Sequence, residues 1–414
     1  MTGAAPDSAT LEIESIAAGG DGVGRTGGLV VFVPRTAPGD LARVALRGKR
    51  RFARGTLLDL ERASPQRVMP ACEHYVADRC GGCQLQHLSY DAQLAAKGAI
   101  IADGVGRIGR RTIAPLAVEA SDAQWRYRRK LTLHLRRVDD GFIAGLHPYD
   151  DAAAVFDLHD CPITDDRVVA IWRAMRPAFE LLPRQRALRA SVQLVDGGAS
   201  AVVSGGTTWG FADRFFAAVP ALTELWWKPD DERPRRMASR RGAPGAGASF
   251  AQVNARVAAR LRAHVLTLAR AGDPRRVVDA YAGTGATAIP LAEEGRMVTA
   301  IEWDHDAVAS LRARLPAPSS AIAGRVEEHL DRTLPADLVL LNPPRTGLDA
   351  RVTELLQGMT PRPARVVYTS CDPATLGRDL ARMPGWRVAS VQAYDMFPQT
   401  AHVETVCELV PEDA

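Results

Sequence analysis

Residues 364–376 read ARVVYTSCDPATL and combine two structural signals in one stretch. The β-branched and aromatic run is typical of a strand, and Asp372-Pro373 fit the N-cap and first residue of a following helix. Cys371 therefore lies at a junction between a strand and a helix. Because a helix N-terminus favours negative charge, we expect the thiol of Cys371 to be biased toward the thiolate.

The sequence around this junction alternates strand and helix patterns. Strand-like runs follow one another at 276–283, 297–302, 337–342 and 364–370, with a short further candidate at 319–324. The chain then ends with two runs, WRVASVQAYD and ETVCELV, that resemble an antiparallel pair. We predict an α/β fold for this region, with a doubly wound sheet and an antiparallel terminal hairpin. Ligands of such sheets bind beyond the carboxyl ends of the strands.

A glycine-rich turn follows the first of these strands. Residues 279–290, DAYAGTGATAIP, contain G-x-G-x-x-A, so Gly283 and Gly285 allow a ligand to approach the backbone closely. Glu302 closes the next strand, where a carboxylate can accept the hydroxyl groups of a ribose. This combination fits a dinucleotide site and an S-adenosylmethionine site equally well.

A second turn separates these two alternatives. The run DLVLLNPPRTG ends a strand with Asn342-Pro343-Pro344-Arg345, and two prolines fix the backbone at the strand end. Such a turn is typical of class I methyltransferases, where it borders the methyl donor and the target base. The sequence therefore favours methyl transfer over hydride transfer.

The rest of the chain divides into two further regions. Residues 1–63 alternate short strands with glycine-rich turns and predict a small barrel of about five strands, like an OB-fold. Residues 64–245 predict an α+β middle domain, whose helical part at about 88–115 can pack on the catalytic domain. We interpret 233–249 as an aperiodic linker, and we place the catalytic domain at 246–414.

Charge and composition indicate a partner and a compartment. Lys and Arg total 52 against 48 Asp and Glu, and the basic residues concentrate in segments 43–54, 125–137 and 233–241. Such clusters are typical of polyanion binders. The sequence contains no export signal at its start and no apolar run near the roughly 18 residues of a membrane helix. We therefore expect a cytoplasmic protein that does not contact membranes.

Four of the six cysteines form a candidate metal site. Cys72, Cys80, Cys83 and Cys161 supply four thiolate ligands, which suit a structural zinc ion or an iron–sulfur cluster. From chemistry alone zinc is favoured, because zinc sites with four thiolates are common. Cys407 alternates within ETVCELV and is expected in the core.

Taken together, these motifs resemble one family over essentially the whole chain. NPPR, SCDPATL and FPQTAHVE, in this order behind DAYAGTG, look like the RNA uracil-5-methyltransferases. The first domain resembles their TRAM RNA-binding barrel, and FAQVN at 250–254 matches the start of their methyltransferase domain.

The resemblance assigns a chemistry to the strand ends. Carbon C5 of uracil is a poor nucleophile, but addition of a thiolate at C6 makes C5 electron-rich, and a base must then remove the C5 proton. The resemblance implies that Cys371 is the nucleophile and Glu404 the base. His402 lies two residues before Glu404 and is either a neighbour of the site or an ordinary exposed histidine.

The resemblance also implies the cofactors. S-adenosylmethionine is expected beside a set of residues from the strand ends and the domain start: Gln252, Tyr281, Gly283, Gly285, Glu302 and Asn342. The family usually carries Asp where this chain has Asn342, and the loss of that charge is expected to weaken attraction for the cationic cofactor. For the four cysteines, the resemblance favours a [4Fe–4S] cluster over zinc.

The resemblance implies that the partner is RNA, with 23S ribosomal RNA as the substrate. We expect the enzyme to be a monomer. We expect the barrel, segment 233–241, and Arg126, Arg128 and Lys130 of the middle domain to contact it. Three alternatives remain open on the sequence: methylation of a transfer RNA uridine, methylation of a base amino group, and a non-catalytic RNA-binding or assembly protein.

Overall fold

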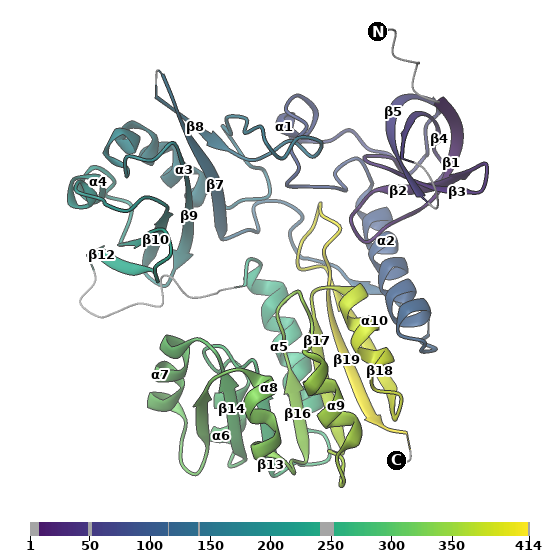
Figure 1. Ribbon diagram of the computed structural model, residues 1–414, viewed down its shortest axis with the longest axis vertical. Helices are drawn as coiled ribbons and strands as arrows, with labels where there is room; N and C mark the ends of the chain where they lie inside the picture. The colour runs from purple at the N-terminus through teal and green to yellow at the C-terminus, as the bar shows by residue number, and fades with distance from the viewer. Residues whose placement is uncertain (1–7, 49–51, 115, 140, 241–251, 413–414) are drawn as a thin grey trace.

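The computed structural model describes residues 8–48, 52–114, 116–139, 141–240 and 252–412. Figure 1 shows a small barrel and a middle domain side by side above a larger C-terminal domain. Within these described ranges, no helix is long and apolar enough to cross a membrane.

The N-terminal region is a closed barrel of five strands in the order β1-β2-β3-β5-β4, which confirms the predicted small barrel. Alternate residues such as Leu11, Ile13, Val31 and Val33 point inward and form its core. The strands are β1 (Ser8–Ile16), β2 (Gly22–Thr26), β3 (Leu29–Val33), β4 (Leu41–Arg47) and β5 (Phe52–Arg62).

The middle domain is built on a six-stranded sheet in the order β12-β11-β10-β9-β7-β8. Helices α3 and α4 contribute to one hydrophobic core with one face of this sheet. Its elements are α1 (Glu73–Val76), β7 (Lys130–Val138), β8 (Gly141–Gly145), α3 (Asp166–Met175), a 3₁₀ turn (Arg176–Leu181), β9 (Ala187–Val195), β10 (Gly198–Ser204), α4 (Ala212–Ala218), β11 (Glu224–Lys228) and β12 (Arg235–Ser239).

One element of the middle domain differs from the sequence prediction. The segment 233–249 was expected to be an aperiodic linker, but its residues Arg235–Ser239 form the edge strand β12, antiparallel to β11. Arg235 stacks on the Trp227 ring at 4.5 Å, and Arg240 donates to the Phe216 carbonyl at the end of α4. These contacts order a stretch whose composition alone looks like a loop, whereas residues 241–249 lie outside the described ranges.

The C-terminal domain confirms the predicted doubly wound α/β fold with a terminal hairpin. Its eight-stranded sheet has the order β15-β14-β13-β16-β17-β19-β18-β6, and β19 runs antiparallel to both of its neighbours. The elements are α5 (Ala255–Arg270), β13 (Arg276–Ala280), α6 (Ala288–Glu293), β14 (Met297–Glu302), α7 (His305–Arg314), β15 (Ser320–Ala323), α8 (Val326–His329), a 3₁₀ turn (Leu330–Thr333), β16 (Leu338–Leu341), α9 (Ala350–Gly358), β17 (Arg365–Ser370), α10 (Pro373–Ala381), β18 (Trp386–Tyr394) and β19 (Glu404–Pro411).

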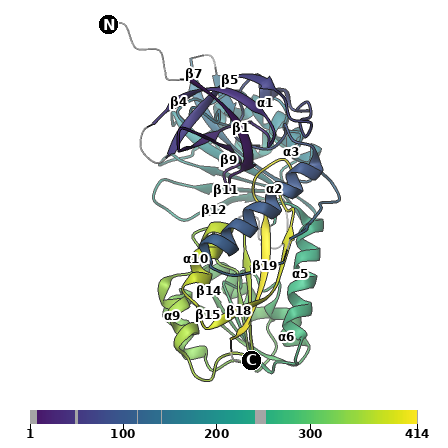
Figure 2. The same cartoon turned by 90° about the vertical axis from the view of Figure 1, so that its right-hand side faces the viewer.

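Helices cover both faces of this sheet, as Figure 2 shows with α5 and α6 on one side and α9 and α10 on the other. Helices α5, α6 and α7 share one buried cluster with the sheet, and α8, α9 and α10 share the second. The strands are therefore buried on both faces, which leaves their ends as the places where a ligand can enter.

One helix outside the C-terminal domain packs against it. Helix α2 (Tyr90–Asp103) continues into a π-helical turn (Gly104–Ile108), and β6 (Val118–Glu119) then adds a short parallel strand beside β18. A Cβ atom at Gly104 would lie 2.5 Å from the Pro373 carbonyl oxygen, and one at Gly377 would lie 2.1 Å from the Gly104 carbonyl oxygen. Glycine is thus required where the π-helical turn after α2 meets α10, the helix that follows Cys371.

Candidate active site

The predicted site residues gather along one edge of the C-terminal sheet. Ala280, the last residue of β13, pairs with Ile301 of β14 on one side and with Leu341 of β16 on the other. Tyr281, Glu302 and Asn342 each lie at or directly after these strand ends. Because parallel strands present their carboxyl ends at the same edge, the structure brings these three residues together.

The glycine-rich turn has the backbone geometry that its sequence predicts. Gly283 and Gly285 have φ angles of 56° and 87°, a left-handed conformation that favours glycine. A Cβ atom at Gly285 would lie 2.4 Å from the Leu311 side chain. Tyr281 also adopts a positive φ, 63°, which is rare for a bulky residue and marks a backbone held by its surroundings.

Glu302 holds this turn in place. One carboxylate oxygen accepts a hydrogen bond from the Gly283 amide at 2.8 Å, and the other accepts from the Asp304 amide at 2.8 Å. The carboxylate oxygens retain lone pairs that can accept further hydrogen bonds. Asp279, behind the turn, accepts from the Thr287 hydroxyl at 2.5 Å, and burial raises the pKa of Asp279 to about 6.

Cys371 and Glu404 lie next to each other across two antiparallel strands. The register of β17 and β19 ends with Ser370 opposite Thr405, so the next positions along the two strands are Cys371 and Glu404. Cys371 is half-buried, whereas Glu404 is only 6% exposed. The nucleophile and the base that the resemblance implies therefore share the same edge of the sheet as the glycine-rich turn.

The electrostatic state of the thiol differs from the sequence prediction. Burial and the charge of Glu404 raise the pKa of Cys371, so the resting thiol is not biased toward the thiolate. The expected helix effect is weak because Asp372, not Cys371, is the N-cap. The Asp372 carboxylate accepts hydrogen bonds from the Ala374 and Thr375 amides at 2.9 Å each, and so occupies the donors at this helix end.

Burial raises the pKa of Glu404 to about 7, since removal from water disfavours the charged carboxylate. A carboxyl group with this pKa is partly protonated near neutral pH, which suits proton transfer. His402, two residues earlier, is half-buried. Burial lowers its pKa to about 4, and the positive charges of Arg345 and Lys97 contribute to this shift. His402 is therefore neutral at pH 7.

Arg345 is the site residue to which the sequence reasoning gave no role. Its positive charge opposes the pKa shifts of both Cys371 and Glu404, lowering each. Arg345 is exposed and follows Pro343-Pro344 directly, so the rigid turn that ends β16 places a cation near enough to influence Cys371 and Glu404. The signal was present in the NPPR motif, but the sequence does not say where the guanidinium points.

Asn342 and Gln252 are the last two residues predicted to contact the cofactor. Asn342 is exposed, its amide donates to the Ala280 carbonyl at 3.3 Å, and its side chain has no hydrogen-bond partner within the described part of the chain. Gln252 is half-buried and precedes Asn254, the residue that caps α5. Phe250 and Ala251 of the FAQVN segment lie outside the described ranges.

The four cysteines of the middle domain are free thiols in a common environment. Cys72, Cys83 and Cys161 share a small buried cluster with Tyr127 and Ile163. Burial raises the pKa of Cys80 to about 12, with further contributions from Cys161 and Cys72. Among the residues that the structure describes, no three His, Cys, Asp or Glu side chains are arranged to hold a metal ion. The cysteine site thus remains a prediction.

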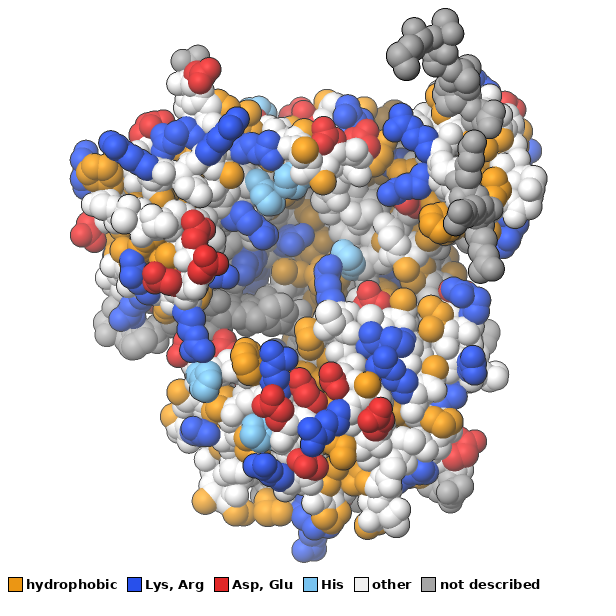
Figure 3. Space-filling view, in the orientation of Figure 1, with side chains coloured by type: hydrophobic (Ala, Val, Ile, Leu, Met, Phe, Trp, Pro, Cys, Tyr) orange, Lys and Arg blue, Asp and Glu red, His pale blue; other side chains and the backbone are white. Residues whose placement is uncertain are grey.

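Basic side chains surround the space above this edge. Figure 3 shows Lys and Arg on both sides of a hollow between the middle domain and the C-terminal domain. Of the residues predicted to contact RNA, Arg126 forms a two-pronged ion pair with Asp160 at 2.8 and 3.0 Å, which would compete with a phosphate. The Arg128 guanidinium donates to the Lys130 carbonyl at 3.0 Å.

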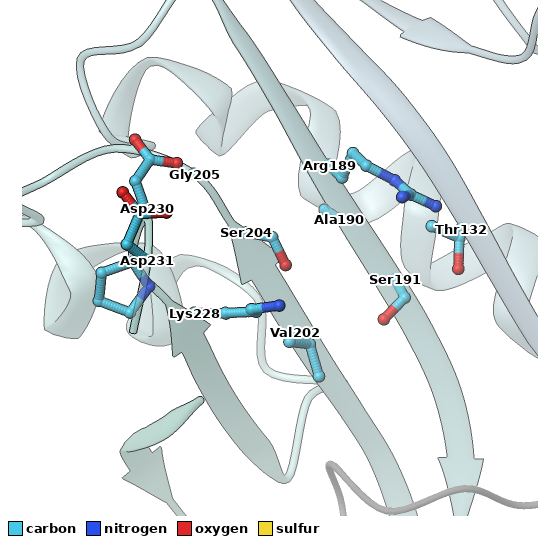
Figure 4. A pocket seen from close by; sticks show the side chains of 11 residues that line it. Thr132, Arg189, Ala190, Ser191, Val202, Ser204, Gly205, Lys228, Asp230 and Asp231 are labelled. Atoms are coloured by element: carbon cyan, nitrogen blue, oxygen red, sulfur yellow. The ribbon is translucent and has the colours of Figure 1, made fainter. Parts of the chain in front are cut away.

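A second hollow of about 380 Å³ lies on the sheet face of the middle domain that α3 and α4 leave open. Figure 4 shows Lys228 extending between Ser204 and Val202, while Arg189 extends toward Thr132. Two acidic residues that follow β11 close one end of this hollow. Its centre therefore offers two cations and several hydroxyl groups to a polar ligand.

Comparison with known proteins agrees with this geometry. A profile described as tRNA (Uracil-5-)-methyltransferase matches residues 327–410, and a TRAM-domain profile matches residues 9–58. An uncharacterized RNA methyltransferase of Thermosynechococcus vestitus is 32% identical, over 96% of this chain and 97% of its own. The 23S rRNA (uracil(1939)-C(5))-methyltransferase RlmD of Stenotrophomonas maltophilia is 31% identical over 95% of both chains.

A solved structure shares the fold. The tRNA (uracil-54, C5)-methyltransferase of Pyrococcus abyssi, in complex with S-adenosyl-L-homocysteine, superimposes with a TM-score of 0.71 at 22% identity, over 97% of this chain and 99% of its own. The fold is thus that of an RNA-modifying methyltransferase with an N-terminal TRAM barrel. The chain belongs to the RNA uracil-5-methyltransferase family and is an enzyme.

Proposed function

We propose that this protein transfers a methyl group from S-adenosylmethionine to C5 of a uridine in RNA, by way of a covalent bond between Cys371 and C6. The observation that carries this proposal is the placement of Cys371 opposite Glu404 at the strand edge that also holds the glycine-rich turn. At that edge, one uracil ring could meet a nucleophile, a base and the glycine-rich turn that we assign to the cofactor.

The roles of the chain's own groups follow from the bonds that must form and break. Cys371 first loses its thiol proton to solvent. The positive charge of Arg345 favours the thiolate needed for the next step. The thiolate sulfur then adds to C6, and the electron pair of the C5–C6 double bond moves toward C5 and O4. As C5 bonds to the methyl carbon, the bond between that carbon and the sulfonium sulfur of the donor would break, and S-adenosylhomocysteine would leave. After C5 has bonded to the methyl carbon, Glu404 takes the C5 proton, the C5–C6 double bond re-forms, and the C6–S bond breaks.

S-adenosylmethionine supplies the methyl group as a good electrophile. We propose that Gly283 and Gly285 let it approach the backbone, that Glu302 accepts its ribose hydroxyls, and that Gln252 and Tyr281 contact it from either side of the turn. Asn342 supports a ligand-facing role, because its exposed side chain lies directly after β16, beside the glycine-rich turn, and can both donate and accept hydrogen bonds. Asn342 stands where the family usually carries an aspartate. At this position the cofactor would therefore interact with an amide dipole and not with a negative charge.

We propose 23S ribosomal RNA as the substrate. The support is that the RlmD relative named for this substrate is 31% identical over nearly its whole length. The open sheet face of the middle domain, with Arg189 and Lys228, offers donors that RNA phosphates could accept from. A target uridine must leave its stack to reach Cys371, so we expect a loop or an opened helix.

We also propose that the middle domain holds an iron–sulfur cluster. The support is chemical: four free thiols are the donor set of such a cluster, Cys72, Cys83 and Cys161 share one buried cluster, and the charges of Cys161 and Cys72 affect the pKa of Cys80. The iron–sulfur cluster would organise the fold of the middle domain. Protein purified without oxygen should be brown and contain iron. Colourless, iron-free protein would refute the cluster, and one bound zinc ion would identify the alternative.

The reaction is tested with purified protein, radiolabelled S-adenosylmethionine, and separate ribosomal and transfer RNA. We expect 5-methyluridine in ribosomal RNA by nucleoside mass spectrometry, and no product from Cys371→Ala. Methylation by Cys371→Ala would exclude the covalent route, and mass spectrometry would then locate the methyl group on a base amino group. Methylation of transfer RNA alone would overturn the substrate assignment.

A further inference from the structure

The loop that connects β18 to β19 is buried. It spans residues 395–403 and leads directly into Glu404, and the exposed fraction is 0% at Asp395, 2% at Gln399 and 0% at Val403. Hairpin loops usually contain about 2–5 residues, so flanking strands alone do not shape a loop of this length. A buried loop also needs partners for its backbone groups. Contacts from outside the hairpin therefore decide its conformation.

Gln399 shows where these contacts come from. Its amide donates to Gln93 Oε1 at 2.9 Å, and its side-chain oxygen accepts from Gln93 Nε2 at 3.0 Å. Its carbonyl oxygen accepts from the amides of Gln84 at 3.2 Å and Leu85 at 3.0 Å. The residues that satisfy Gln399 thus all come from segment 84–93, about 300 positions earlier in the chain.

The backbone of Gln399 also needs this support. Its φ angle is 70°, in the left-handed region that is strained for a residue with a Cβ atom. Such conformations persist only where the surroundings over-determine them. Without the paired amide of Gln93, the loop would lose two of the hydrogen bonds that hold this conformation.

The same side of the molecule anchors the rest of the loop. Lys97 Nζ donates to Asp395 Oδ1 at 2.5 Å and to the Phe397 carbonyl at 3.0 Å, and both charged side chains are fully buried. The Tyr127 hydroxyl donates to the Pro398 carbonyl at 3.0 Å. The loop is therefore fixed at three successive points before the chain reaches Glu404.

We propose that Gln93 is a positioning residue for the reaction: by clamping Gln399 from helix α2, it sets the place and direction of the Glu404 carboxylate against the C5 proton. The inference rests on the proposed function, in which Glu404 acts only after Cys371 has bonded to the RNA. Gln93 itself does not reach the substrate. Its loss should therefore slow proton removal and release while leaving formation of the covalent bond nearly intact.

The test is Gln93→Met, which keeps the side-chain volume and removes both hydrogen bonds to Gln399. The matched control is Gln357→Met on α9, whose amide oxygen accepts from Gly385 at 3.0 Å and does not contact the loop. Single-turnover reactions with RNA are followed on denaturing gels, where the protein–RNA bond is visible, and by tritium release from C5-labelled uridine. Thermal unfolding reports the folded fraction of each variant.

We expect Gln93→Met to release tritium roughly 10–100-fold more slowly, to accumulate the covalent species, and to form it within about 3-fold of the wild-type rate. Gln357→Met should behave as wild type in both steps. Equal slowing of bond formation and release, or release at the wild-type rate, would overturn the proposal. If Gln93→Met does not fold, Tyr127→Phe, which removes only the bond to Pro398, must show the same split or the proposal is wrong.

Glu404→Gln separates this inference from the function on which it rests. If Glu404→Gln accumulates the covalent species and Gln93→Met does not, the positioning role fails while the proposed function stands. If Glu404→Gln accumulates nothing, or if Cys371→Ala still transfers methyl groups, the proposed function itself is at fault.

Discussion

Replacing Glu404 with glutamine should change how the stability of the protein depends on pH. Glu404 is 6% exposed, and burial raises its pKa from 4.5 to about 7. The folded state therefore holds the carboxyl proton more tightly than the unfolded chain does. Protonation stabilises the folded state fully below about pH 4.5, and this contribution is lost as pH rises through about 7. Glutamine does not ionise and removes the dependence.

The size of the effect follows from the two pKa values. The difference between 4.5 and about 7 corresponds to about 3 kcal/mol at 1.36 kcal/mol per pKa unit. The free energy of unfolding of Glu404→Gln, relative to wild type, should therefore increase by about 3 kcal/mol between pH 4 and pH 8. Somewhat more than half of this change should be complete by pH 6, because the unfolded carboxyl is almost fully ionised there while the folded one is still mostly protonated.

The assay is urea unfolding of both proteins at intervals from pH 4 to pH 8, with Trp fluorescence as the probe. Only the change with pH is diagnostic, since the new amide can add a constant offset at every pH. A stability difference that stays constant across this range would show that Glu404 titrates normally in the folded protein. The carboxyl group would then not be poised near neutral pH, and the argument for its role as base would lose its physical support.

Three further changes test other parts of the site. Arg345→Met removes a charge that lowers the pKa of Cys371, so the pH dependence of its alkylation by iodoacetamide should shift to higher pH; an unchanged profile would place the guanidinium too far away to act. Gly285→Ala should destabilise the protein by about 2–4 kcal/mol in thermal unfolding, from the positive φ and the 2.4 Å approach of a leucine, and a neutral effect would mean that the turn can relax. Lys97→Met leaves a buried carboxylate at Asp395 and should cost about 3–5 kcal/mol, whereas adding Asp395→Leu should recover part of the loss; no recovery would show that packing, rather than charge, dominates.

Local signals in the sequence were sufficient to predict most of the fold. The barrel, the parallel strands and the terminal hairpin follow from short patterns of apolar residues and turn residues, which depend on neighbours in the chain. The edge strand Arg235–Ser239 was missed because its order comes from pairing with β11 and from Arg235 stacking on Trp227. Neither contact can be predicted from the sequence of this segment, which is rich in Arg and Pro.

The sequence by itself also determined which residues are candidates for the proposed chemistry, since most of them lie where a strand pattern ends and a turn or helix pattern begins. Only the tertiary structure decided how those candidates are arranged and charged. The β17–β19 register sets Cys371 beside Glu404, burial raises the pKa of both, and Arg345 opposes the shifts. The support of the loop before Glu404 by Gln93 was equally invisible, because the partners lie about 300 residues apart. Motifs are local, whereas desolvation, charge and hydrogen bonding depend on what the folded chain brings within a few ångströms.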